Sequence, residues 1–193
     1  KIGEAAFYGP KLDVQVKPAV GNEYTLSTCQ LDFCLPMKFD LNYIDKDGTK
    51  KTPVVIHRAI FGSIDRFMAF YLEETKGILP LWLAPVGVIV MPVNSEYQTE
   101  YAEEVTKWLK EKHIRVELDA RNEKLSYRMR EAQMRRVPYT LILGDNEKND
   151  HMISYRVYGK NETITVPWDE FLTLLNNDIK EKKLIEKNGF QYK

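Results

Sequence analysis

Two residues, His57 and Arg66, have types and a spacing that could support chemistry at one site. They lie in the stretch HRAIFGSIDRF, residues 57–67, which follows the apolar run PVVI. The run is typical of a strand, and Gly62 and Ser63 are expected to open a helix after it. His57 would lie at the strand's end and Arg66 one turn past the glycine. This arrangement places a potential metal ligand and a fixed positive charge at the mouth of one site.

Lys11 is the next candidate, because it follows the turn formed by Gly9 and Pro10 and begins a segment that alternates as a strand does. It is either a solvated lysine where the strand begins or a cation aimed at a substrate carboxylate or phosphate. His57 also has two interpretations. A lone histidine at a strand end is more often a structural hydrogen-bonding residue, and a zinc site usually needs at least three protein ligands.

A second strand is predicted over residues 24–33, YTLSTCQLDF. Its alternation puts Thr28, Gln30 and Asp32 on one face, which is either exposed to solvent or the floor of a polar pocket. The two cysteines of the chain, Cys29 and Cys34, do not have the spacing of a standard zinc knuckle and are interpreted as core thiols.

The first half of the chain is expected to be an antiparallel sheet followed by a single helix over about 62–76. The segment LNYIDKDGTKK predicts a hairpin with Asp47-Gly48 as its turn. A sheet of this size with one helix is a thin core for an independent domain. Because the chain also begins at Lys1 rather than Met, we expect it to start inside a larger protein.

The sequence pattern of the second half predicts a complete α/β domain. This domain follows a proline-containing linker, GILPLWLAP, at 77–85. Its pattern of β-α-β-α-β-β-β-α predicts a three-layer α/β domain with a mixed, largely parallel five-stranded sheet. Ser95 and Gln98 are expected to form a capping box at its first helix, and Asn122 to cap its second. The domain boundaries are therefore set at 1–82 and 83–193.

The segment from Arg121 to Arg136 is basic in a chain whose net charge is zero. It carries six cations: Arg121, Lys124, Arg128, Arg130, Arg135 and Arg136. The segment is either a solvated helix face with salt bridges or a surface that binds RNA phosphates. No interleaved aromatic residues signal base stacking.

The composition of the chain limits the class of protein to which it can belong. The chain is 44% hydrophobic and 29% charged, as soluble globular proteins are. No apolar run comes near the roughly 18 residues that a membrane span requires. The low cysteine count fits a reducing compartment, so a cytoplasmic location is expected, with no membrane partner.

Three segments, GEAAFYGPK, STCQLDF and HRAIFGSIDRF, resemble the C-terminal part of the catalytic domain of class II threonyl-tRNA synthetases of the bacterial type. The last of them resembles motif 3 of class II, which contacts ATP. By this resemblance Arg66, Lys11 and Gln30 are catalytic. The positions expected to bind ATP or substrate are Tyr8, Thr28, Gly62, Ser63 and Arg66.

The resemblance also implies cofactors. His57 matches one of three zinc ligands, and the other two are expected upstream of Lys1. In the family the zinc ion binds the amino and hydroxyl groups of threonine, which separates threonine from the nearly isosteric valine. Mg²⁺ is expected with ATP, where it and arginine side chains stabilise charge on the reacting phosphate.

The stretch DARNEKLSYRMREAQMRRVPY, residues 119–139, resembles the anticodon-binding domain shared by the threonyl, prolyl, histidyl and glycyl enzymes. This likeness implies contacts with anticodon bases or nearby phosphates from five residues: Asn122, Lys124, Arg130, Glu147 and Arg156. A carboxylate such as Glu147 can accept a hydrogen bond from a base amino group.

The expected function is therefore that of the C-terminal portion of a threonine–tRNA ligase, with ATP, threonine and threonine tRNA as partners and a homodimer as the parent enzyme. Because motifs 1 and 2 are expected upstream, the chain alone should be inactive. The alternative is a non-catalytic tRNA-binding module or truncated paralogue. A third possibility is an α/β domain of unrelated function with a basic face.

Overall fold

The computed structural model describes residue 3 and residues 5–18 and 21–184. The chain divides into two compact units, Lys1–Lys76 and Gly77–Lys193, called unit 1 and unit 2 below. The division falls a few residues before the boundary expected after residue 82. Within the described part of the chain, no helix has the length and apolar character to cross a membrane.

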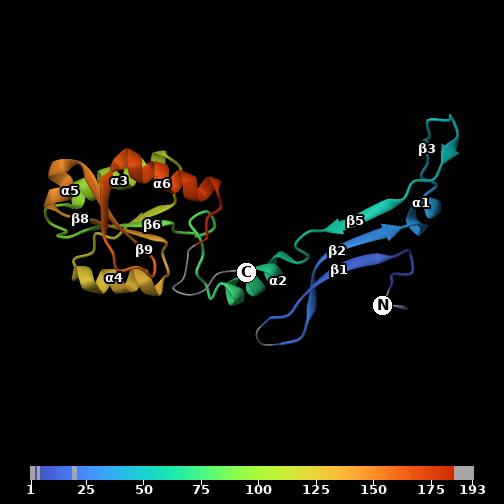
Figure 1. The fold of residues 1–193 in the computed structure, drawn as a ribbon, viewed down its shortest axis with the longest axis horizontal. Helices are drawn as coiled ribbons and strands as arrows, with labels where there is room; N and C mark the ends of the chain where they lie inside the picture. The colour runs from blue at the N-terminus through green and yellow to red at the C-terminus, as the bar shows by residue number, and fades with distance from the viewer. Residues whose placement is uncertain (1–2, 4, 19–20, 185–193) are drawn as a thin grey trace. The chain divides into compact units, whose positions relative to one another are not determined.

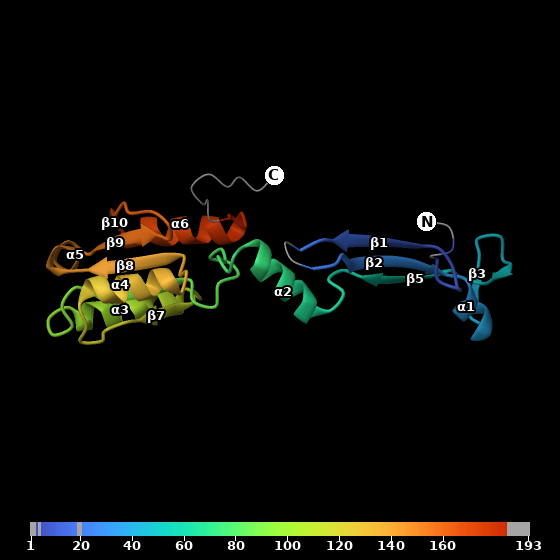
Figure 2. The same cartoon turned by 90° about the horizontal axis from the view of Figure 1, so that it is seen from below.

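Unit 1 contains a three-stranded antiparallel sheet in the order β1-β2-β5 and a separate small hairpin, β3-β4 (Figures 1 and 2). Its elements are β1 (Lys11–Val16), β2 (Tyr24–Asp32), α1 (Cys34–Lys38), β3 (Tyr43–Ile44), β4 (Lys50–Lys51), β5 (Val55–Ala59) and α2 (Ile64–Glu74). The hairpin closes through the N–H of Asp45, which donates to the carbonyl of Thr49 at 2.9 Å. The predicted antiparallel sheet, hairpin and single long helix are confirmed.

The short helix α1 was not predicted, and Asp32 explains it. Its Oδ1 accepts hydrogen bonds from the backbone N–H groups of Cys34 at 2.8 Å and Leu35 at 2.9 Å. These bonds fix the first turn after β2, so the helix depends on one side chain rather than on a periodic apolar pattern.

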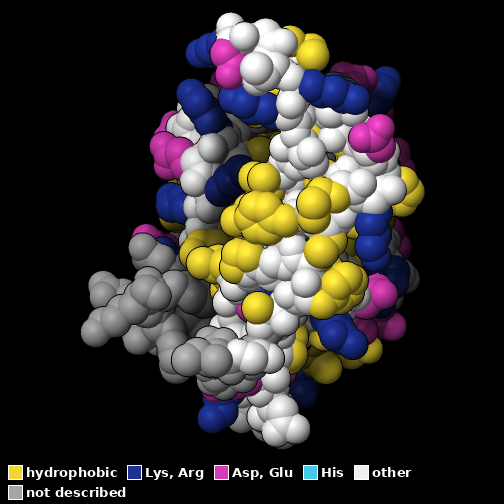
Figure 3. All heavy atoms as spheres, turned by 90° about the vertical axis from the view of Figure 1, so that its right-hand side faces the viewer, with side chains coloured by type: hydrophobic (Ala, Val, Ile, Leu, Met, Phe, Trp, Pro, Cys, Tyr) yellow, Lys and Arg dark blue, Asp and Glu magenta, His cyan; other side chains and the backbone are white. Residues whose placement is uncertain are grey.

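Many apolar side chains of unit 1 lie at its surface. Ile56 is 62% exposed and Leu12 is 66% exposed. The described residues of unit 1 contribute no member to the two clusters of buried apolar side chains in the chain. Figure 3 shows apolar side chains, in yellow, gathered on one exposed face of the chain. The expectation of a thin core in this half agrees with this burial pattern.

Unit 2 is a three-layer α/β domain with a mixed sheet in the order β10-β9-β8-β6-β7. Its elements are β6 (Val88–Pro92), α3 (Thr99–Glu111), β7 (Val116–Leu118), α4 (Leu125–Met134), β8 (Tyr139–Leu143), α5 (Asp145–Asp150), β9 (Met152–Val157), β10 (Ile164–Pro167) and α6 (Trp168–Lys180). β7, β6 and β8 are parallel, and β9 and β10 continue the sheet antiparallel to their neighbours. The predicted fold class is confirmed.

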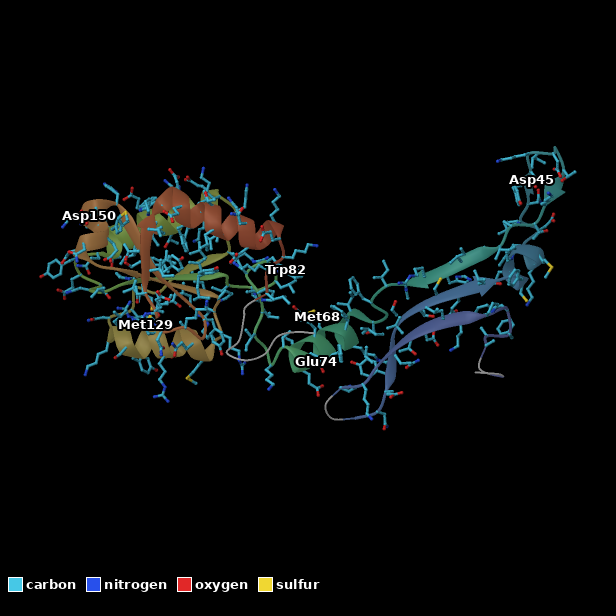
Figure 4. All side chains as sticks on the ribbon, viewed as in Figure 1. Asp45, Met68, Glu74, Trp82, Met129 and Asp150 are labelled. Carbon is cyan, nitrogen blue, oxygen red and sulfur yellow. The ribbon has the colours of Figure 1, made fainter. Side chains whose placement is uncertain are left out.

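The core of unit 2 lies on both faces of this sheet. α3 and α6 cover one face, where Val90 and Leu141 are fully buried (Figure 1). α4 covers part of the other face, where Ile89 and Met91 pack against Ala132 and the partly buried Met129 (Figure 4). The continuous apolar run of β6 is explained, because both of its faces are covered.

Two predicted helix caps are wrong. α3 begins only at Thr99, and the hydroxyl of Ser95 donates instead to the carbonyl of Arg121 at 3.0 Å. α4 begins at Leu125 with Lys124 as its cap residue, so Asn122 does not cap it. The sequence pattern assigned the Ser95 side chain to a helix cap, but in the structure its hydroxyl forms a hydrogen bond between two loops instead.

Candidate functional site

Three of the predicted site residues form a row across the sheet of unit 1. In the strand register Lys11 of β1 lies opposite Gln30 of β2, and Gln30 lies opposite His57 of β5. Directly opposite residues of antiparallel strands point to the same face, so the three side chains line up; we call them the polar row. The expectation that Gln30 and Thr28 share one face of β2 is met by the same register.

A hydrogen-bonded chain fixes the centre of the polar row. The hydroxyl of Tyr8 donates to Oε1 of Gln30, and Nε2 of Gln30 donates to the hydroxyl of Thr28 at 3.2 Å. That hydroxyl donates to Oδ1 of Asp13 at 2.7 Å, and Nζ of Lys11 lies 2.7 Å from the other oxygen of Asp13. The bond from Lys11 and the bond from Thr28 lower the pKa of Asp13. Both polar groups of the Gln30 amide are therefore oriented.

Asp13 was missed by sequence reasoning, although it lies two residues after Lys11 and so on the same face of its strand. The ion pair also determines the state of Lys11, because its ammonium group already contacts a carboxylate. A ligand phosphate or carboxylate that binds Lys11 must share the ammonium with Asp13.

His57 is oriented by a fully buried carboxylate. Its Nε2 lies 2.9 Å from Oδ2 of Asp32, whose side chain is 0% exposed. Burial raises the pKa of Asp32, but the bonds from the Leu35 N–H, His57 and the Cys34 N–H outweigh this effect and lower it. With Nε2 bonded to the carboxylate, Nδ1 is the ring nitrogen left for another partner.

A carboxylate behind a histidine is the usual support of a metal-ligating imidazole, so His57 fits the role of a single zinc ligand. No group of three or more His, Cys, Asp or Glu suited to a metal occurs among residues 3, 5–18 and 21–184. Cys29 cannot join His57, because it lies opposite Leu12 and Arg58 in the register and so points to the other face of the sheet.

The turn before α2 is built closely against β2. Gly62 has a φ of +58°, and a Cβ at this position would lie 2.8 Å from the carbonyl oxygen of Leu26. Only glycine combines this left-handed conformation with this close approach. Ser63 is the cap residue of α2, and Arg66 lies exposed in its first turn. Among the described residues, Arg66 is not part of the hydrogen-bonded group around the polar row.

In unit 2 the predicted tRNA contacts divide among three places. Asn122 and Lys124 lie between β7 and α4, and Glu147 lies in the first turn of α5 after β8. Both segments follow the carboxyl ends of parallel strands, and they therefore lie at one edge of the sheet, where open α/β sheets usually bind ligands. Arg130 lies on α4 and Arg156 on β9.

Glu147 has both oxygens engaged at this edge. Oε2 accepts the backbone N–H of Gly144 at 2.8 Å, and Oε1 accepts the hydroxyl of Ser154 at 2.6 Å. That hydroxyl also lies 2.6 Å from the hydroxyl of Thr165 on β10. The short helix α5, which was not predicted, begins at this capping bond. A base amino group could still approach the remaining lone pairs of the carboxylate.

Arg156 lies on the face of the sheet that α4 partly covers. Arg156 lies opposite Thr140 in the strand register, and Thr140 lies opposite Ile89, so the three side chains point to the same face. Ile89 belongs to the apolar cluster that packs against α4. Nε of Arg156 donates to the hydroxyl of Thr163 at 2.7 Å. β9 and β7 are three strand spacings apart, about 14 Å. The predicted contacts therefore cover a width suited to several nucleotides rather than to one.

The basic segment of residues 121–136 is not one uniform surface. Arg128 is fully buried. Arg121 pairs with Asp119 at 2.7 Å and Glu131 at 2.5 Å, and Arg135 pairs with Glu117 at 2.7 Å. Part of the segment is therefore salt-bridged, but none of these three pairs joins two residues of α4, so they are not the bridges along a helix face that the spacing suggested. These pairs leave fewer cations available to phosphates than the sequence suggested.

Arg130 lines a cavity of about 620 Å³ between β7 and α4. The helix residues Tyr127, 50% exposed, and Met134, 70% exposed, lie one turn on either side of it along α4. Sequence reasoning missed Tyr127 because the segment has no second aromatic residue. An exposed ring beside an arginine is the combination on which unpaired bases stack.

Comparisons with known proteins agree for the two units. Residues 2–75 match the family described as tRNA synthetase class II core domain (G, H, P, S and T), and residues 87–178 match the anticodon binding domain family. The threonine–tRNA ligase of Geobacillus kaustophilus is 53% identical over 181 residues, which cover 94% of this chain and 28% of that protein. The ligase of Staphylococcus carnosus is 53% identical over 182 residues, with the same coverage.

Two solved structures are similar to both units. The RNA binding domain of threonyl-tRNA synthetase from Cryptosporidium parvum has a TM-score of 0.83 and 34% identity, over 91% of this chain and 44% of that chain. A putative threonyl-tRNA synthetase from Aeropyrum pernix has a TM-score of 0.72 and 28% identity, over 93% and 43%. The chain thus spans just over a quarter of the length of the curated relatives that it matches.

Proposed function

The chain belongs to the threonyl-tRNA synthetase family, and we propose that it forms the C-terminal portion of a threonine–tRNA ligase. Unit 1 contributes residues to the site where threonine is activated with ATP, and unit 2 binds the anticodon arm of threonine tRNA. The observation that carries the catalytic part is the polar row of Lys11, Gln30 and His57 on one sheet face.

The polar row and Arg66 together supply groups that the formation of an aminoacyl-adenylate needs. A threonine carboxylate attacks the α-phosphate of ATP, the bond between the α-phosphate and the bridging oxygen breaks, and pyrophosphate leaves. Negative charge builds on the phosphate oxygens during this step. Lys11 and Arg66 would stabilise that charge, to which Mg²⁺ bound with ATP would add a further positive charge, and the oriented amide of Gln30 would hold the substrate. Gly62 lets the backbone approach β2 closely, which makes room for the nucleotide beside the start of α2.

His57 holds the amino-acid side of the site. Through Nδ1 it would serve as one ligand of a zinc ion, with Asp32 fixing the ring. When bound, the zinc ion would supply two coordination positions for the amino and hydroxyl groups of threonine, which valine cannot fill. The upstream part of the ligase would provide the remaining ligands.

Activation is tested by threonine-dependent exchange of pyrophosphate into ATP. We expect no exchange with the 193-residue chain and robust exchange with the same chain joined to the upstream part of the ligase. Arg66→Ala in the extended protein should lower the exchange rate by at least about a hundredfold, because a charge stabilising the transition state is lost. An extended protein without activity would contradict the ligase assignment.

Unit 2 carries the tRNA-binding half of the proposal. The predicted contacts lie beyond the carboxyl ends of the parallel strands, on α4 and on β9, and from these places they can hold bases and phosphates. We expect the chain alone to bind threonine tRNA measurably and to bind it less tightly when the anticodon is changed. Equal affinity for the two tRNAs would contradict the assignment of base contacts.

The second candidate is a tRNA-binding module that does not charge its tRNA. It is favoured by one observation, since both clusters of buried apolar side chains lie in unit 2, so the part assigned to tRNA binding has a core of its own. Anticodon-dependent tRNA binding combined with an inactive extended protein would select this candidate. The homodimer stays a prediction from the resemblance, to be checked by ultracentrifugation of the extended protein. The cytoplasmic location stays a prediction from the low cysteine count, to be checked by cell fractionation.

A further inference from the structure

Arg128 is the one arginine among the largest fully buried side chains of the described residues, with 0% of its surface exposed. Its guanidinium group forms no ion pair there and donates to three backbone carbonyl oxygens. NH1 lies 2.7 Å from the oxygen of Asp119, NH2 lies 2.8 Å from that of Pro92, and Nε lies 3.2 Å from that of Glu123. Burying a cation is costly in free energy, and the three carbonyl acceptors offset part of this cost. Such an arrangement indicates that Arg128 has a specific structural role.

The three acceptors show what Arg128 connects. Asp119 and Glu123 are the two ends of the segment 119–123 that follows β7, and Pro92 is the last residue of β6. One side chain therefore connects both ends of an irregular segment to the end of β6, an interior strand of the sheet. The middle is held separately, because the carbonyl of Arg121 accepts the hydroxyl of Ser95 at 3.0 Å and the N–H of Glu123 at 2.8 Å.

The fastened segment contains Asn122 and leads directly into Lys124, two of the residues that the proposed function assigns to the anticodon. We propose that Arg128 is a positioning residue for anticodon recognition, which it serves by holding segment 119–123 in the shape that presents Asn122 and Lys124. This inference rests on the proposed function of unit 2. It removes Arg128 from the set of residues that could touch RNA phosphates.

Burial distinguishes this role from a direct contact. A phosphate cannot reach a side chain with no exposed surface, and each of the three guanidinium nitrogens of Arg128 donates to a backbone oxygen. Arg130, two residues further along the same helix, is exposed and lines a cavity. Holding a recognition loop in its bound shape lowers the ordering cost of binding, and it favours the ligand that fits that shape.

The test compares Arg128→Met, which keeps the volume but removes the donors, with Lys107→Met, which removes one exposed cation from α3. For each chain we measure the dissociation constants of threonine tRNA and of the same tRNA with a changed anticodon at fixed salt. We expect the ratio of the two constants to fall about tenfold in Arg128→Met and to stay unchanged in Lys107→Met. Without RNA, hydrogen exchange of the amides in segment 119–123 should speed up only in Arg128→Met.

The outcomes separate this inference from the proposed function. A wild-type chain that does not distinguish the two tRNAs contradicts the proposed base recognition. A wild-type chain that distinguishes them, with an unchanged ratio in Arg128→Met, overturns the positioning role alone, as does unchanged exchange in the segment. If Arg128→Met does not fold, the same measurements are made on Arg128→Lys, because a single ammonium group can replace some but not all of the three hydrogen bonds. We then expect an intermediate ratio, and a wild-type ratio overturns the inference.

Discussion

At the scale of single residues, buried or well-packed side chains orient the chemical groups. Asp32 fixes the ring of His57 and also starts α1 through two backbone N–H groups. Asp13 bridges Lys11 and Thr28 in the same way. Two candidate site residues, His57 and Lys11, are therefore supported by carboxylates on the same sheet, and each carboxylate also accepts hydrogen bonds from other groups.

The close approach of Gly62 to β2 gives a stability prediction. Gly62→Asn should destabilise the chain by about 1–3 kcal/mol, because its Cβ would lie 2.8 Å from the carbonyl oxygen of Leu26. Gly48→Asn is the matched control, since Gly48 also has a positive φ but nothing lies within 4 Å of its Cβ position. Urea unfolding followed by circular dichroism measures both. Equal losses in the two variants would show that the contact with Leu26 is unimportant.

The buried pair of Tyr139 and Asp178 gives a second stability prediction. The hydroxyl of Tyr139 on β8 donates to Asp178 on α6. Burial, together with this bond, raises the pKa of Tyr139. Tyr139→Phe should lower the free energy of unfolding of unit 2 by about 1–3 kcal/mol, because a buried carboxylate loses a donor. Tyr155→Phe on the neighbouring strand should cost less. Calorimetry on the whole chain compares them, and a larger loss in Tyr155→Phe would contradict the prediction.

At the scale of elements, α4 has two functional sides. Leu125, Met129 and Ala132 pack toward the sheet, at the spacing of one helix face. The spacing could not show that Arg128 also lies inside, because an arginine becomes buried only when carbonyl groups from distant segments converge on it. The same limit applies to α1 and α5, which begin at side-chain bonds rather than at an apolar repeat.

Strand faces were easier to predict from sequence than helix ends. Alternation places Thr28 and Gln30 on one face, and the register then adds Lys11 and His57 to it. The register itself depends on which strands pair, which no local pattern contains. The helix caps predicted at Ser95 and Asn122 were wrong, because short polar side chains suit a helix cap and a loop contact equally well.

The exposed side of α4 predicts the salt dependence of tRNA binding. Arg130→Ala should weaken binding of both tRNAs to a similar degree and reduce the slope of log affinity against log salt by about one, because one phosphate contact is lost. Lys107→Met on α3 should leave the slope unchanged. Filter binding at several salt concentrations measures the slopes. An unchanged slope in Arg130→Ala would mean that this arginine does not contact a phosphate.

At the scale of the whole chain, the two units differ in how their apolar residues are used. Unit 2 has buried apolar clusters on both faces of its sheet, whereas the described residues of unit 1 contribute to neither cluster. The sequence predicted this contrast from the number of helices available to cover each sheet. It could not predict which side chains remain exposed, because exposure depends on how every element packs.

This difference predicts how the two halves behave when separated. Residues 77–193 alone should show a cooperative thermal transition by circular dichroism, because their core is complete within the unit. Residues 1–76 alone should show a broad transition or none, because about 25 cal/mol is gained per Å² of apolar surface buried and little is buried here. A sharp transition in residues 1–76 would contradict this reasoning.

The aromatic packing of unit 2 has an optical consequence. All three tryptophans of the chain, Trp82, Trp108 and Trp168, lie in unit 2. The rings of Trp108 and Trp168 lie 5.0 Å apart, and the indole N–H of Trp168 donates to the hydroxyl of Tyr101 at 2.9 Å. Selective excitation of indole fluorescence therefore reports on unit 2 alone. The intact chain thus contains a built-in probe that follows unit 2 without interference from unit 1.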